Sequence, residues 1–135
     1  MTRNLSRLLY ALSALIFGFG GVMHALAFVR KALPTIAASN LAPFFQAELK
    51  TLWLCDSTTL VALAVLFGYL SVKPCAMSRT LVWLVALVPA GTTLLLYTFL
   101  GPFYAGHLLL AATVMAVLAS ALSPETDRSL AVAAP

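Results

Sequence analysis

Three side chains in this sequence have the chemistry for proton transfer or for ligand binding, and each lies within or beside a long apolar run. They are His24, Asp56 and His107. An ionisable side chain inside a membrane segment costs free energy and usually marks a function. An aspartate beside a histidine can hold the imidazole in one tautomer and tune its basicity. We therefore take Asp56 as a base or orienter and His24 as a proton donor or acceptor, with His107 and Glu48 gating or polarising the mouth of one shared site.

Further polar and aromatic side chains lie close to Asp56 on the same predicted helix. Trp53 and Thr59 lie three residues either side of it, and Ser57 follows it directly. Helical spacing brings these side chains near Asp56, where they offer an aromatic wall and hydroxyl groups. The sequence therefore predicts the rim of a polar pocket. Its predicted ligand-binding residues are Glu48, Trp53, Ser57 and Thr59.

The same residues also allow other chemistries. Two histidines with an aspartate and a glutamate could bind zinc or non-haem iron, and two histidines on different helices could ligate a haem. No local motif such as HExxH accompanies them, and Ser57 has no nucleophile elbow around it. The cofactor therefore stays unknown. Asp56 could also simply pair with His24, His107 or Lys50 and lock the helices together, since buried polar pairs also hold membrane helices in place.

The composition indicates which elements must position these residues. Hydrophobic residues make up 62% of the 135 residues and charged residues only 9%, so we expect lipid rather than water around the chain. A hydrocarbon core of about 30 Å needs about 20 apolar residues in a helix. Four runs meet this length, and they predict one all-α transmembrane domain that forms a four-helix bundle. The predicted spans are about 8–29, 51–72, 80–100 and 106–122, followed by a disordered tail over 124–135.

The first run and the connection after it need separate treatment. Ala25, Leu26 and Ala27 resemble a signal-peptide cleavage site, but the histidine and glycines of this run favour a retained helix. The connection over 31–50 contains Pro34 and Pro43 among several large apolar residues. We expect it to be partly helical, and either to lie on the membrane surface or to fold back as a cap over the bundle.

The basic residues predict an orientation rather than a nucleic-acid partner, because they lie between the apolar runs and form no continuous patch. Arg3, Arg7, Lys73, Arg79 and Arg128 fall on one predicted side of the membrane. The other side has only Arg30, Lys31 and Lys50. This difference favours both termini in the cytoplasm. We expect the membrane itself to be a bacterial inner membrane. The same difference also places His24, Asp56 and His107 near the outer face.

The glycine-rich first run, with Gly18, Gly20 and Gly21 before His24, and the tight hairpin at the end resemble the DoxX-like group of small bacterial membrane proteins. This resemblance covers the architecture and implies a four-helix bundle that works beside a redox or quinone-linked partner. It carries over no catalytic residue.

Three functions therefore remain open at this point, and whether the protein is an enzyme is undecided. The first is a membrane-embedded site that binds a small lipophilic molecule or performs acid/base chemistry on it. The second is an accessory subunit that docks on a larger membrane complex through faces of small residues, or forms a homo-oligomer. The third is a haem or metal carrier. Membrane lipid is a partner in all three.

Overall fold

The structure is a computed structural model that describes residues 2–123, and it is helical throughout with no strand in that range. Four of its helical stretches are long and apolar enough to cross a membrane. This agrees with the all-α class and with the number of spans predicted from the sequence. The predicted disordered tail over 124–135 lies outside the described residues. In chain order the elements are α1 (Thr2–Ala27), the π-helix η1 (Phe28–Ala32), α2 (Leu33–Ala37), α3 (Pro43–Val72), α4 (Arg79–Leu100) and α5 (Tyr104–Leu122).

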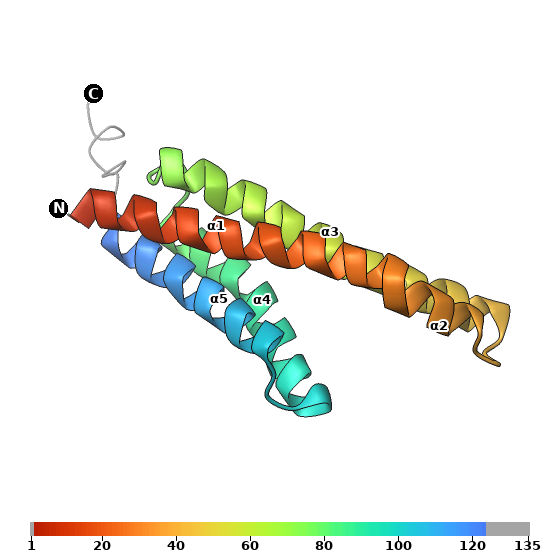
Figure 1. Cartoon of the computed structure of the whole chain (residues 1–135). Helices are drawn as coiled ribbons and strands as arrows, with labels where there is room; N and C mark the ends of the chain where they lie inside the picture. The colour runs from red at the N-terminus through yellow and green to blue at the C-terminus, as the bar shows by residue number, and fades with distance from the viewer. Residues whose placement is uncertain (1, 124–135) are drawn as a thin grey trace, which may run out of the picture.

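The first three elements run into one another as one rod of 36 residues, Thr2–Ala37 (Figure 1). At about 1.5 Å per residue the rod is about 54 Å long, far more than a hydrocarbon core of about 30 Å. Helix α3 runs antiparallel beside it for 30 residues, or about 45 Å. Both elements therefore extend well beyond the spans 8–29 and 51–72 that their hydropathy predicted.

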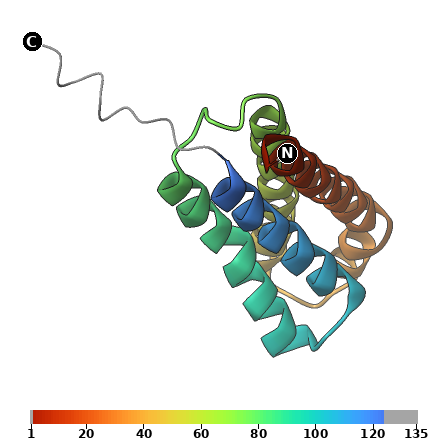
Figure 2. The ribbon, with the colours of Figure 1, turned by 90° about the vertical axis from the view of Figure 1, so that its left-hand side faces the viewer.

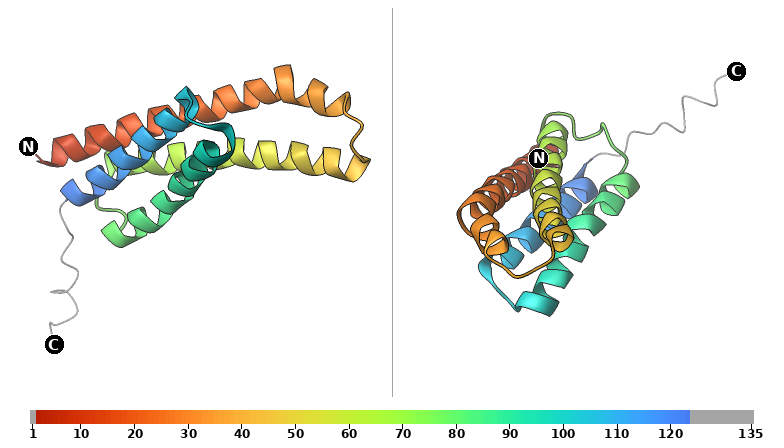
Figure 3. Two further views of the ribbon diagram at one scale, coloured as in Figure 1. Left: turned by 90° about the horizontal axis from the view of Figure 1, so that it is seen from below. Right: turned by 90° about the vertical axis from the view of Figure 1, so that its right-hand side faces the viewer.

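The connection predicted over 31–50 is helical over most of its length, but it does not fold back over the bundle. It continues the two long helices outward as a two-helix extension, residues 25–55, which we call the arm (Figure 3). The reason lies in its prolines. Pro43 occupies the first turn of α3, where a missing backbone N–H removes no hydrogen bond, and Pro34 follows the π-helix η1 in the first turn of α2 without ending the rod. They begin α2 and α3 rather than interrupting a loop.

Helices α4 and α5 form the tight hairpin that the Gly101-Pro102 sequence predicts. The Ser78 hydroxyl caps α4 by accepting a hydrogen bond from the backbone N–H of Leu81 (3.3 Å). Gly101 ends α4 with a φ of 75°, a conformation that favours glycine. The indole of Trp83 donates to the Ser120 hydroxyl across the pair (2.8 Å).

Helix α1 is the central element, because it packs against α3 on one face and against α5 on the other, while α4 packs on α5 (Figure 2). Towards α3 it presents small residues, and a Cβ added to Gly18 would lie 3.5 Å from the Cβ of Ala64. Towards α5 it presents hydroxyls, since Ser6 donates to the carbonyl of Ala119 (2.8 Å). The core joins both interfaces. Its buried residues are Tyr10, Phe17, Leu63, Phe67, Leu70, Val82, Leu109, Ala112, Ala116 and Ala119.

The α4–α5 hairpin diverges from the axis of α1 and α3, so the arm projects beyond it (Figures 1 and 3). The register of α1 against α5 shows at which residue of α1 the hairpin ends and the arm begins. Ser6 lies level with Ala119 and Ser13 with Ala112, because each serine hydroxyl donates to the carbonyl of its partner. Continuing this antiparallel register puts His24 level with the α4–α5 turn. His24 is therefore at the base of the arm, where the hairpin ends.

Candidate functional site

His24 is held against α3 by three side chains at the base of the arm. Its Nδ1 lies 2.9 Å from the Ser57 hydroxyl oxygen, and its Nε2 lies 3.4 Å from a carboxylate oxygen of Asp56. Its ring stacks on the indole of Trp53, with ring centroids 4.6 Å apart and planes 17° from parallel. Both ring nitrogens therefore face a partner, and one face of the ring is covered.

Trp53 also fixes the backbone of α1 at this position. Its indole N–H donates to the carbonyl oxygen of His24 (3.0 Å), so one α3 residue holds both the ring and the main chain of the histidine. Phe28 is a buried residue at the start of η1. It also packs against the Trp53 indole, with ring centroids 6.5 Å apart. The imidazole thus has a defined orientation rather than a free rotamer.

Gly21 lets the two helices come close enough for these contacts. It lies one turn before His24 on the same face of α1 and is buried. A Cβ at this position would lie 2.9 Å from Cγ2 of Val61 and 3.3 Å from the backbone oxygen of Ser57. The bare backbone of Gly21 therefore packs directly on α3, and this approach brings His24 within hydrogen-bond distance of Ser57.

The pair is shielded on one side and open on the other. Ser57 is buried, with 5% of its surface exposed, whereas the side chains of His24 and Asp56 are 30% and 39% exposed. A molecule outside the helices can therefore reach part of the His24 and Asp56 side chains. It cannot reach the buried Ser57 hydroxyl.

One arrangement of hydrogens satisfies every group around the imidazole. The Ser57 hydroxyl has a single hydrogen and lies 3.2 Å from the Trp53 carbonyl oxygen, to which it can donate. If it does so, its oxygen is free to accept from Nδ1–H of His24. Nε2 then lies 3.4 Å from a carboxylate oxygen of Asp56, close enough for an ion pair when the imidazole is protonated.

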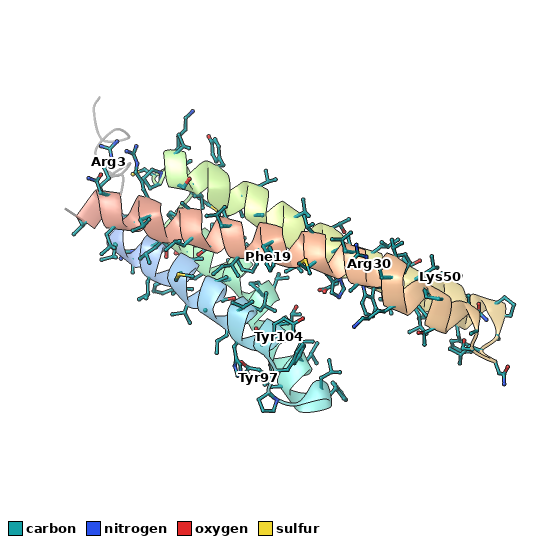
Figure 4. All side chains as sticks on the ribbon, viewed as in Figure 1. Arg3, Phe19, Arg30, Lys50, Tyr97 and Tyr104 are labelled. Atoms are coloured by element: carbon teal, nitrogen blue, oxygen red, sulfur yellow. The ribbon has the colours of Figure 1, made fainter. Side chains whose placement is uncertain are left out.

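His107 belongs to a separate pair on the α4–α5 hairpin. Its Nδ1 shares a hydrogen bond of 2.7 Å with the hydroxyl of Tyr97, and its side chain is exposed. Within residues 2–123 no hydrogen bond, ion pair or ring contact joins His107 to His24 or Asp56. Figure 4 shows Tyr97 on the hairpin, away from Arg30 and Lys50 on the arm. The structure therefore brings together residues of α1 and α3, whereas the predicted shared site also needed His107 from α5.

The other predicted binding residues also lie apart from the imidazole. Glu48 is exposed on the arm two turns before Asp56, and no side-chain bond within residues 2–123 holds it. The Thr59 hydroxyl donates to the carbonyl of Cys55 within its own helix (2.8 Å). Gly21 and Phe28 also contribute to the site, although neither was predicted as a site residue. Gly21 belongs to the glycine-rich part of the first run, and this glycine content was the signal for it.

The described donor groups form no obvious metal centre. Across residues 2–123 there is no group of three or more His, Cys, Asp or Glu side chains placed to hold an ion. His24 and His107, the two imidazoles required for a bis-histidine haem site, are each bonded to neighbours on different helix pairs.

Fold and site together define an α-helical protein with four helices long and apolar enough to span a membrane, and with a histidine–aspartate pair where its arm begins. Comparison of the chain with protein-family models, with curated proteins and with solved structures found no match. The resemblance to the DoxX-like group therefore stays a prediction.

Proposed function

We propose that this protein binds a small lipophilic molecule with a hydrogen-bonding head group and exchanges a proton with it at His24 and Asp56. The observation that carries the proposal is the position of the partly exposed imidazole, with Nδ1 beside the Ser57 hydroxyl and Nε2 beside the Asp56 carboxyl group. A weakly acidic hydroxyl, as in a phenol or a quinol, fits this pair. The hydroxyl can donate a hydrogen bond to the Asp56 carboxylate, and a proton on His24 or Asp56 can exchange with the hydroxyl proton, so that the ligand leaves as the neutral molecule.

The surroundings of the pair favour a ligand that arrives from lipid. Large apolar side chains next to the site point outward, among them Val22, Met23 and Leu52, each about half exposed. All four long helices carry similar side chains, such as Leu15, Val65, Leu94 and Leu118. Such a surface suits acyl chains. The proposal therefore places the helices in a bacterial inner membrane, with the basic end and both termini in the cytoplasm and the arm outside.

Trp53 provides a direct reporter for the test. The chain has two tryptophans, so Trp83→Phe leaves the one that stacks on His24. Bromine quenches the fluorescence of an indole that it contacts, so para-bromophenol serves as the probe and para-bromoanisole, which lacks the hydroxyl hydrogen, as its matched control. We expect saturable quenching by the phenol at concentrations about tenfold or more below those the anisole needs, since a hydrogen bond to a charged group is worth about 1.5–3 kcal/mol.

The decisive variant is Asp56→Asn, which keeps the size of the side chain and removes its charge. We expect it to reduce phenol binding to the level of the anisole. Glu48→Gln, the same change two turns away on the same helix, should leave binding unaltered. Equal phenol affinity in Asp56→Asn and the parent protein would refute the proposal. So would an Asp56→Asn protein that no longer elutes as the native species, because the pair would then be a structural lock.

A further inference from the structure

A pocket of about 290 Å³ lies at the end of the bundle opposite the arm, between the start of α1 and the connection from α3 to α4. Its walls combine three cationic side chains with four short ones. They are Arg3, Arg7 and Lys73, with Val72, Pro74, Cys75 and Ala76. Figure 4 shows Arg3 at this end, with Arg30 and Lys50 at the other. The pocket is thus remote from His24 and Asp56.

Arg7 is the fixed member of this group. Its Nη2 donates to the carbonyl oxygen of Val72 at the end of α3 (3.1 Å), which ties α1 to α3. Its Nε is buried and has no hydrogen-bond partner in the described part of the chain. A guanidinium has five N–H donors in a planar fork, and the one bond to Val72 leaves the other N–H groups of the two terminal nitrogens of Arg7 for an anion with several oxygens.

The electrostatics of this end also favour an anion. Arg3 and Lys73 are exposed, and the Nζ of Lys73 lies 5.7 Å from the centre of the Tyr69 ring. Within residues 2–123 the two acidic side chains, Glu48 and Asp56, belong to the other end of α3, so neither neutralises these cations.

We propose that this pocket binds the phosphate group of an anionic phospholipid. The helix ends lie where lipid head groups are expected if the chain spans a membrane, and basic pockets between helices on the cytoplasmic side suit such head groups. Arg7 would supply bonds of fixed direction, while Arg3 and Lys73 would supply charge. The short side chains of Pro74 and Ala76 leave room beside the phosphate for the glycerol.

Native mass spectrometry of the full-length protein tests the proposal. The protein is mixed with equal amounts of phosphatidylglycerol and phosphatidylcholine that carry the same acyl chains, and the bound lipid is counted. We expect the parent protein to retain phosphatidylglycerol in preference. A basic residue near an anionic lipid surface is worth about fivefold in affinity, so the double variant Arg3→Gln, Lys73→Gln should lose about twenty-five-fold.

The matched control is Arg30→Gln with Lys31→Gln, which removes the same charge in η1, towards the other end of the rod. It should keep the preference for phosphatidylglycerol. If both double variants lose the preference equally, net charge and not the pocket selects the lipid, and the assignment is wrong. If inorganic phosphate at the concentration of the lipid displaces it, the site takes free phosphate and the lipid assignment is again wrong.

Discussion

Replacing Gly21 by alanine is expected to force α1 and α3 apart directly beside His24. The new methyl group would lie 2.9 Å from Cγ2 of Val61, 3.3 Å from Cβ of Leu60 and 3.3 Å from the backbone oxygen of Ser57. The side chain of Val61 is partly exposed and can turn away. The Leu60 Cβ and the Ser57 oxygen belong to the helix itself and can only move with it.

The size of the effect follows from two opposing terms. Overpacking a close contact costs about 1–3 kcal/mol. Alanine gains up to about 1 kcal/mol over glycine in a helix. Gly18→Ala gains the same helix propensity, but its new Cβ meets Ala64 at 3.5 Å, an ordinary contact. The difference between the two variants therefore isolates the steric term, and we expect Gly21→Ala to have a free energy of unfolding about 1–3 kcal/mol below that of Gly18→Ala.

The assay is equilibrium unfolding in mixed micelles of dodecyl maltoside and dodecyl sulfate, followed by circular dichroism. The fluorescence of Trp53 at zero dodecyl sulfate is a second readout, because separation of the helices weakens the stack between Trp53 and His24. Equal free energies of unfolding for the two variants would refute the close approach at Gly21. Unchanged Trp53 fluorescence in a destabilised Gly21→Ala would show that the site does not depend on that approach.

Two further substitutions test the other interfaces in the same titration. Gly106→Ala places a Cβ 2.6 Å from Cε1 of Tyr97, so we expect the free energy of unfolding to fall by about 1–3 kcal/mol. Its control is Gly91→Ala, whose Cβ meets no atom within 4 Å and should cost nothing. Equal free energies of unfolding for the two variants would contradict the packing of Tyr97. Ser6→Ala removes a hydroxyl that donates from α1 to the backbone of α5, and we expect a loss of about 0.6–1.7 kcal/mol. Ser71→Ala, whose hydroxyl bonds only within α3, is its control, and a loss no greater than the control's would show that the bond between helices contributes nothing.

The length and apolar composition of the runs were enough to predict the helices, and the turn at Gly101 was enough to predict the hairpin. The first two helices extend beyond the predicted spans for one physical reason. Hydropathy indicates where lipid would end, whereas a helix continues as long as its backbone bonds can form. Pro43 lies in the first turn of α3, where it removes no such bond, and Pro34 follows the π-helix η1 without ending the rod.

The candidate site shows a second limit of prediction from the sequence. The depth of a residue along its helix follows from its distance to the flanking charges, and on this basis His24, Asp56 and His107 were placed at one level. Those charges do not show which side of each helix meets which neighbour, because four antiparallel helices can be ordered in several ways. Here α1 separates α3 from α5, so His24 meets Asp56, while His107 meets Tyr97.

The lengths of the helices explain why an aspartate and a histidine can occupy this position. Helices α4 and α5 have 22 and 19 residues, which suits a hydrocarbon core of about 30 Å. If they set the thickness, the excess length of the rod and of α3 lies on the arm, and His24 and Asp56 lie where hydrocarbon gives way to head groups. A carboxylate costs much less there than at mid-membrane. A ligand held at that level would keep its polar head at the pair and its apolar body among the acyl chains, which is why the proposed function requires a molecule with both parts.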